Sequence, residues 1–309
     1  MVAAGAAKPS YRRRQINNEK EKTMKKYLPH GCVLAAGILW GLIGIFSRRL
    51  TGAGFSPRSI VLVRNLGGLA ILGLMFALAD RSLFKIKAKH LPIFFGTGVV
   101  SLLLFMLCYF SCQQMCSLAV AGSLLYTSPA FVVVLSAILW RDKLTKKKIA
   151  ALVIALLGCT FVTGLWTGDL TVTLQGALFG VGSGFFYGLY SIFGRFALKH
   201  YKPYTVTFYT FVFAGAGSLC VMRPAELAAG FAVPGAFWFA VGLVVVSTVV
   251  PFLLYTKGLA DLESGKAAIL ACIEPVTSAV VGVAVFGEPM SIMVLLGLLF
   301  ILISVYILR

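Results

Sequence analysis

The chain has 309 residues, of which 59% are hydrophobic and only 12% are charged. A soluble protein of this length could not cover its core with so few charged side chains, so the composition excludes an ordinary soluble domain and indicates an integral membrane protein. The net charge of +18 raises nucleic-acid binding as an alternative, but the positions of the basic residues favour a membrane surface.

Residues 1–29 are polar and basic and show no apolar periodicity, which predicts a disordered tail, within which Met24 is an alternative start to Met1. Ten apolar segments follow, each about as long as a helix that crosses a bilayer. They occupy residues 31–47, 57–79, 91–113, 117–140, 148–166, 174–197, 203–222, 234–257, 264–286 and 290–308. The short connections leave no soluble domain in which an enzyme active site could lie.

Lysine and arginine divide unevenly between the connections. If the ten segments alternate in direction, 23 of the 28 basic residues lie on the side of both termini, four lie on the other side, and Arg64 falls within a segment. Because positively charged loops stay in the cytoplasm, this division predicts a multi-pass protein of the plasma (inner) membrane with both termini cytoplasmic. The basic loops are then expected to contact anionic lipid headgroups, and nucleic acid is not expected as a partner.

The two halves of the chain repeat each other with a nearly constant offset of 146 residues. The matched pairs at this offset are Tyr109 and Tyr255, Pro129 and Pro275, Asp142 and Glu288, and Thr145 and Ser291, and an offset of 147 pairs Trp40 with Tyr187 and Arg48 with Arg195. Matches across several segments indicate a duplication. Each unit contains five segments, an odd number, so the second unit crosses the membrane in the opposite sense. The predicted fold is therefore all-α, with ten transmembrane helices in two inverted five-helix repeats, at residues 30–166 and 174–309.

Several short motifs resemble those of a known family. They are Leu39-Trp40-Gly41, Arg64, Tyr109, Ser128-Pro129, Glu274-Pro275-Val276 and Val285-Phe286-Gly287-Glu288. With them, residues 31–308 resemble the EamA-like branch of the drug/metabolite transporter superfamily. The first repeat departs from the family pattern, because Arg141-Asp142 stands where a Gly-Glu pair is usual. The resemblance implies export or exchange of small metabolites across the plasma membrane and leaves the substrate open.

Two charged residues lie well inside apolar segments and are candidate substrate ligands. A carboxylate at the depth of Glu274 costs about 2.5–3.5 kcal/mol or more, so it is expected to face a cavity or a partner. It could bind an amine or a proton, or form a hydrogen bond between helices. Arg64 could bind a carboxylate or phosphate, or pair with an acidic group. Trp40 and Tyr126 are expected to supply walls, and Ser128 occupies the position that Glu274 has in the second repeat.

Matched residues near the ends of segments are candidates for the solute pathway. Tyr109 and Tyr255 are both expected near the cytoplasmic ends of their segments, where they could form a gate or belong to the interfacial aromatic belt. Arg48 and Arg195 are expected to anchor their segments at the interface.

The two matched prolines predict bends near the middle of the bilayer. Pro129 and Pro275 each remove a helical hydrogen bond, and such breaks are tolerated where they line a cavity. Lys266, Leu270 and Glu274 are spaced by four and are expected on one helical face. Lys266 could then lie at the cytoplasmic mouth of the pathway or snorkel to the interface.

The predicted function is secondary, non-ATP-driven transport of a small solute by alternating access, by an exporter or exchanger of amino acids or related charged or amphiphilic solutes. No phosphate-binding loop, metal-ligand spacing or catalytic triad is found in the sequence, so neither an enzyme nor a cofactor is predicted. Proton coupling at Glu274 is a narrower hypothesis. A non-transporting membrane protein, such as a sensor or an assembly partner, is the alternative, and a homodimer is left open.

Overall fold

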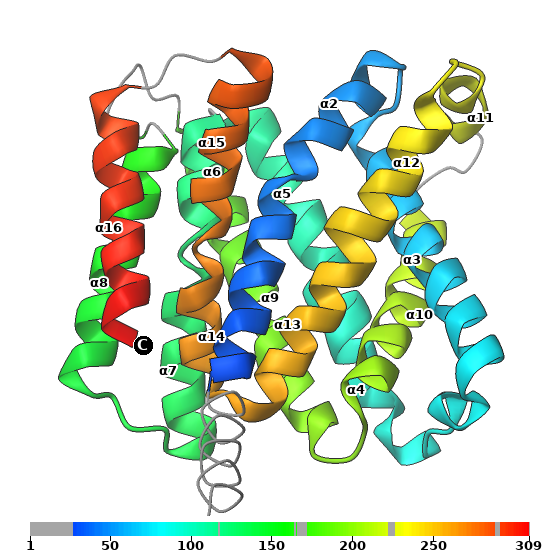
Figure 1. Ribbon diagram of the computed structural model, residues 1–309, viewed down its shortest axis with the longest axis horizontal. Coiled ribbons are helices and arrows are strands. Elements are labelled where there is room, and N and C mark those ends of the chain that lie inside the picture. Colours follow the sequence, from blue (N-terminus) through cyan, green and yellow to red (C-terminus); the bar gives the residue numbers. More distant parts are fainter. Residues whose placement is uncertain are drawn as a thin grey trace, which may run out of the picture.

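The computed structural model describes residues 27–116, 118–163, 165, 172–221, 226–287 and 291–308, and these residues are almost entirely helical (Figure 1). Eight helices are long and apolar enough to cross a membrane, namely Tyr27–Gly52, Pro57–Ala79, Ala88–Met115, Val120–Trp140, Leu174–Leu198, Pro203–Val221, Ala236–Asp261 and Ser264–Phe286. Two helices of 17 residues, α8 (Lys146–Val162) and α16 (Ile292–Leu308), pack along each other and bring the bundle to ten helical segments in this described part. The predicted all-helical membrane fold is confirmed.

The first unit comprises the helix from Tyr27, whose end is α2 (Ile43–Gly52), then α3 (Pro57–Ala79), α4 (Leu91–Phe95), η3 (Gly96–Leu103), α5 (Leu104–Met115), α6 (Leu118–Leu125), α7 (Ser128–Trp140) and α8. The second comprises α9 (Leu174–Leu198), α10 (Pro203–Val221), α11 (Glu226–Phe231), α12 (Ala236–Val244), η4 (Val245–Val249), α13 (Val250–Asp261), α14 (Ser264–Ala271), α15 (Glu274–Phe286) and α16. Short 3-10 turns at Arg81–Phe84 and Ala88–His90 join α3 to α4. The initial basic tail lies mostly outside the described residues.

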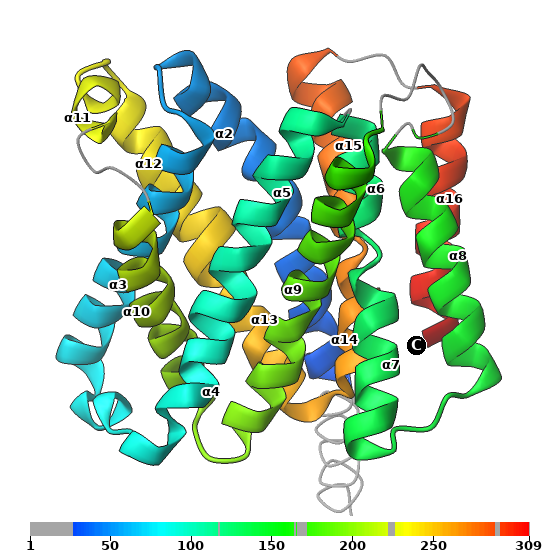
Figure 2. The ribbon, with the colours of Figure 1, turned by 180° about the vertical axis from the view of Figure 1, so that it is seen from behind.

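The two units run through the bundle in opposite senses (Figures 1 and 2). The helix that begins at Tyr27 rises in the view of Figure 1, whereas its counterpart α9 descends. The connections α3–α4, α7–α8, α9–α10 and α13–α14 consequently lie together at the lower end of the bundle. We call this end the basic face, because lysines predicted to share one side, such as Lys87, Lys143 and Lys199, are exposed on these connections or beside them.

The helix boundaries repeat with the offset found in the sequence. Four helices of the first unit begin and end 146 residues before their counterparts, which pairs α5 with α13, α6 with α14, α7 with α15 and α8 with α16. Matched capping residues explain why α8 and α16 begin at equivalent positions. Thr145 accepts a hydrogen bond from the Lys148 amide at 3.2 Å, and the matched Ser291 accepts one from the Val294 amide at 3.3 Å. Both hydroxyls cap a helix N-terminus.

Matched interruptions occur in the third and fourth helices of each unit. Pro129 and Pro275 lie directly after the breaks between α6 and α7 and between α14 and α15, which confirms the predicted bends. In the third helices, η3 and η4 are π-helical, and both end 146 residues apart, at Leu103 and Val249. Because π-helical turns and proline breaks release backbone hydrogen bonds, both units are irregular at the same depth, around the centre of the bundle.

Glycines let the first helix of each unit approach these breaks closely. A Cβ atom on Gly41 would lie 2.7 Å from the carbonyl oxygen of Glu274, and one on Gly188 would lie 3.2 Å from that of Ser128. Glu274 and Ser128 are the first residues after the two breaks and occupy matched positions. Only a residue without a side chain allows this approach, so the glycines fix the position of each break against its neighbouring helix.

Candidate substrate site

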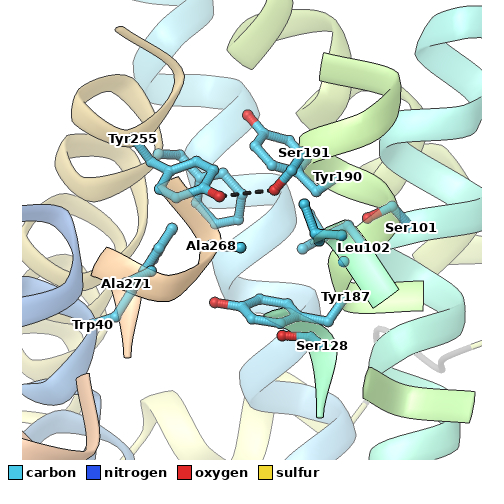
Figure 3. Close-up of a pocket in the computed structure, with 13 residues that line it drawn as sticks. Trp40, Ser101, Leu102, Ser128, Tyr187, Tyr190, Ser191, Tyr255, Ala268 and Ala271 are labelled. Atoms are coloured by element: carbon cyan, nitrogen blue, oxygen red, sulfur yellow. Dashed lines mark hydrogen bonds between the residues drawn. The ribbon is translucent and has the colours of Figure 1, made fainter. Parts of the chain in front are cut away.

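An internal cavity of about 30 Å³ lies between helices of both units (Figure 3). Three predicted site residues line it, Trp40, Ser128 and Tyr255, together with Tyr187 and Tyr190. Its walls are mainly aromatic rings carrying a few hydroxyl groups. A volume of this size accommodates roughly two water molecules, so a metabolite could enter only if the surrounding helices moved apart.

The predicted charged residues meet next to this cavity. Arg64 on α3 of the first unit and Glu274 at the start of α15 of the second interact electrostatically. The Arg64 Nε donates a hydrogen bond to Thr248 Oγ1 at 3.1 Å, and Thr248 belongs to the π-helical η4. Tyr187 also interacts electrostatically with Glu274. Both charged side chains are half-buried, so neither is fully enclosed.

Three tyrosines interact electrostatically with Glu274. Tyr109, Tyr126 and Tyr187 all interact with its charge. Tyr126 lies in the break between α6 and α7, and Tyr187 also lines the cavity. The structure therefore brings Glu274, Arg64 and Tyr126 together and places Trp40 and Ser128 on the adjoining cavity, with Tyr187 joining the two parts.

Two sequence expectations about the pathway are wrong. Tyr109 does not share the basic side with Tyr255, because α5 ends at the opposite face whereas α13 ends at the basic face (Figure 1). Residues matched between inverted repeats must lie at opposite ends of the bundle. Lys266 and Glu274 do not lie on one continuous helix either, because the break after Ala271 separates α14 from α15. Lys266 is half-buried in the first turn of α14, near the basic face.

Sequence reasoning missed several residues of the site, notably Tyr187, Tyr190 and Thr248. The repeat carries a signal for Tyr187, since it matches Trp40, itself a candidate. Ser247, the neighbour of Thr248, matches Ser101 of the cavity wall at the offset of 146 that the third helices share. Tyr190 donates or accepts a 2.6 Å hydrogen bond with Thr256 and carries no comparable sequence signal.

No group of three or more His, Cys, Asp or Glu side chains within the described ranges is arranged to hold a metal ion. Cys108, Cys112 and Cys116 are free thiols on or just after α5, facing small apolar surroundings. The groups that the site offers for binding are the charges of Arg64 and Glu274 and the tyrosine hydroxyls.

The fold and this site define a polytopic helical membrane protein with two inverted five-helix repeats around a central charged pair. The EamA-like transporter family matches the chain twice, at residues 29–164 and 174–309, and the chain belongs to this family. It is 31% identical over 265 residues to an uncharacterized transporter of Archaeoglobus fulgidus, covering 86% of this chain and 90% of that protein.

Other relatives agree with this assignment. The chain is 28% identical over 285 residues to the uncharacterized inner membrane transporter YicL of Salmonella typhimurium, covering 88% of this chain and 92% of YicL. A solved crystal structure that is 17% identical superimposes with a TM-score of 0.74 over 90% of this chain and 95% of its own, which shows the shared fold. The chain is therefore a multi-pass membrane transporter.

Proposed function

We propose that this protein is a secondary transporter that exports or exchanges amino acids or related charged or amphiphilic solutes by alternating access, without catalysis. The observation that carries the proposal is the pair formed by Arg64 and Glu274, one from each inverted repeat, beside a cavity where both repeats are irregular. Binding sites between inverted repeats near broken helices are typical of secondary transporters.

The charges of the pair indicate the class of solute. A solute that binds between Arg64 and Glu274 replaces their mutual attraction, so it must compensate both charges. A carboxylate facing Arg64 and an amine facing Glu274 do so together, whereas a singly charged solute leaves one buried charge unpaired. The rings of Tyr126, Tyr187 and Trp40 provide apolar contact for the remainder of an amphiphilic solute.

Flux measurement on purified protein tests the proposal. Thermal-shift screening against metabolite classes selects ligands, and counterflow in proteoliposomes then measures uptake of the hits. Arg64→Gln and Glu274→Gln are expected to abolish flux, while Lys257→Gln, which changes an exposed lysine at the basic end of α13, retains it. Binding and flux that survive both site substitutions would exclude this site, and absence of flux across a broad panel would favour the alternative, a sensor or assembly partner.

Proton coupling at Glu274 is a second part of the proposal. A half-buried carboxylate that interacts electrostatically with one cation, Arg64, can exchange its proton for the solute amine. Uptake by the wild-type protein should then depend on the pH gradient. If Glu274→Gln kept wild-type pH-dependent uptake in proteoliposomes, this coupling would be abandoned.

We further propose that the protein lies in the plasma membrane with the basic face and both termini in the cytoplasm. The exposed lysines of that face would then meet anionic lipid headgroups. Cysteine labelling in intact cells is expected to find residue 146 protected in the cytoplasm and residue 169 accessible from outside. Labelling of both from one side would contradict the orientation and the number of spans between them.

A further inference from the structure

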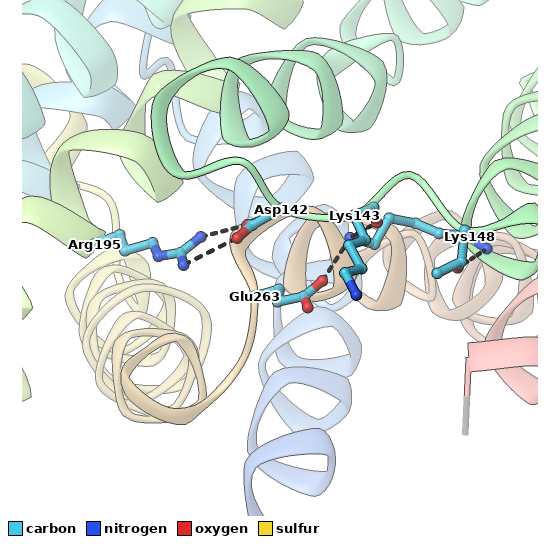
Figure 4. Close-up of polar contacts among 6 residues, drawn as sticks. Asp142, Lys143, Lys148, Arg195 and Glu263 are labelled. Atoms are coloured by element: carbon cyan, nitrogen blue, oxygen red, sulfur yellow. Dashed lines mark hydrogen bonds and ion pairs between the residues drawn. The ribbon is translucent and has the colours of Figure 1, made fainter.

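Two ion pairs connect the repeats at the basic face (Figure 4). The first joins Asp142, in the α7–α8 connection, to Arg195 on α9. The Nη1 and Nη2 atoms of Arg195 donate hydrogen bonds to the two carboxylate oxygens, at 2.5 and 3.3 Å. The guanidinium carbon lies 4.3 Å from the centre of the Trp140 ring. An Arg–carboxylate pair with two hydrogen bonds and an aromatic contact holds a defined geometry, unlike an ordinary surface pair.

The second ion pair lies at the other end of the same connection. Lys148, in the first turn of α8, contacts Glu263 of the α13–α14 connection at 2.5 Å and also donates to the Lys143 carbonyl at 3.1 Å. Only 4% of the Lys148 side chain is exposed. Residues 141–148 therefore form a strap of the first repeat that is attached to the second repeat at both ends (Figure 4).

A buried layer formed by Trp40, Ser191 and Tyr255 borders the cavity and is linked to the α13–α14 connection that the strap contacts. The Ser191 and Tyr255 hydroxyls form a 2.7 Å hydrogen bond (Figure 3), and the Trp40 ring lies 5.4 Å from that of Tyr255. Ser264, next to Glu263, donates to the Ser191 carbonyl at 3.4 Å. Trp40 and Tyr255 are only 6% and 4% exposed, so this layer is tightly packed.

The residues matched to this layer by the repeat are less buried. Tyr187 matches Trp40, and Tyr109 matches Tyr255, yet both are half-buried rather than buried. The layer toward the basic face is therefore packed more completely than its counterpart in the repeat. Since inverted repeats exchange their arrangements when access alternates, the buried layer must loosen in the other state.

We propose that the Asp142–Arg195 and Lys148–Glu263 pairs are a latch that holds the basic face closed, and that both pairs separate when the cavity opens toward that face. This inference rests on the proposed transport function. The latch stabilises one state and does not bind solute. Weakening it therefore shifts the population toward the state open at the basic face, because an interaction present in only one state sets the balance between the two.

Accessibility of the cavity from the basic face tests the latch directly. Ala268 lines the cavity, so Ala268→Cys, a small change, is introduced after replacement of the seven native cysteines. A membrane-impermeant thiol reagent is applied to vesicles that expose the basic face. Asp142→Asn and Glu263→Gln are each expected to increase the labelling rate by about tenfold. Asp261→Asn, which alters an exposed acid of the same face, should leave the rate unchanged.

Exchanging the charges distinguishes a latch from general loosening. The double variant Asp142→Arg, Arg195→Asp rebuilds an ion pair and should return the rate toward that of the unsubstituted protein. Unchanged labelling in Asp142→Asn and Glu263→Gln, or equal acceleration by Asp261→Asn, would overturn the latch. If the cysteine-free protein does not fold, hydrogen–deuterium exchange in residues 252–259 of otherwise native chains gives the same comparison. Neither readout requires flux, so a failed latch and a failed transport proposal are separable.

Discussion

Gly41 lies in close contact with the start of α15, and this contact predicts how much Gly41→Ala destabilises the protein. A Cβ atom at Gly41 would lie 2.5 Å from the Thr277 Cβ and 2.7 Å from the Glu274 carbonyl oxygen, where ordinary contact begins at 3.4 Å. Neither obstacle can be removed by a rotamer change, since one is backbone and the other is a β-carbon. The two helices must therefore separate by about 0.7–0.9 Å in Gly41→Ala.

Such overpacking costs about 1–3 kcal/mol, against which alanine gains roughly 0.5–1 kcal/mol over glycine inside a helix. The expected net loss in Gly41→Ala is thus about 0.5–2 kcal/mol. At Gly44, three residues later on the same helix, an added Cβ atom would meet no other atom within 4 Å. Gly44→Ala is therefore the matched control, and it should be neutral or stabilising.

The repeat provides an intermediate case. A Cβ on Gly188 would lie 3.2 Å from the Ser128 carbonyl oxygen and 2.9 Å from a Val132 methyl group, which can rotate away. The destabilisation should therefore decrease from Gly41→Ala to Gly188→Ala and vanish in Gly44→Ala. Unfolding in mixed detergent micelles measures these free energies. Equal effects at Gly41 and Gly44 would refute the reasoning that the first helix presses on the backbone of Glu274.

Three other predictions address the site and its orientation. Removing Arg64 or Glu274 alone should destabilise the protein by up to about 2.5–3.5 kcal/mol, because the remaining charge then lies in the membrane interior without the opposite charge near it. The double variant Arg64→Gln, Glu274→Gln should lose less than the sum of the two single variants, as measured by an unfolding double-mutant cycle. Tyr187→Phe should weaken ligand binding several-fold in thermal-shift titrations, with little change in the stability of the ligand-free protein. Thiol reagents should label cysteines at Lys146 and Val172 from opposite sides of the membrane, and labelling from one side would contradict the inverted arrangement.

Much of the fold follows from the sequence because it depends on features that a sequence states directly. Apolar length gives the spans, and the matched capping residues Thr145 and Ser291 give the common offset of the last helices. The breaks follow from Pro129 and Pro275, because proline has no amide hydrogen to donate. The π-helical segments have no such marker: they arise where packing replaces the usual hydrogen-bonding pattern, which only the folded chain defines.

The sequence identifies residues of the site but does not show which of them interact in the folded chain. Arg64 and Glu274 stand out as charges inside apolar segments, but their interaction spans 210 residues and depends on how α3 and α15 are rotated in the bundle. The misplaced Tyr109 has a simpler cause. The odd number of spans in each unit already implies inversion, and inversion places matched residues at opposite ends, so Tyr109 could not share the basic end with Tyr255.

The symmetry of the two repeats also suggests why a single pair of charged residues can serve both of them. Pro57 and Pro203 begin matched helices 146 residues apart, so Arg64 corresponds to Thr210, and Glu274 corresponds to Ser128. Each charged residue thus has a hydroxyl counterpart in the other repeat. In the proposed alternating-access mechanism, the aromatic layers and helix breaks exchange roles, and they are present in both repeats, whereas the charges are present once. A single pair at the junction of the two repeats could then face either side, whereas a duplicated pair would leave unpaired charges buried whenever one of two positions was empty.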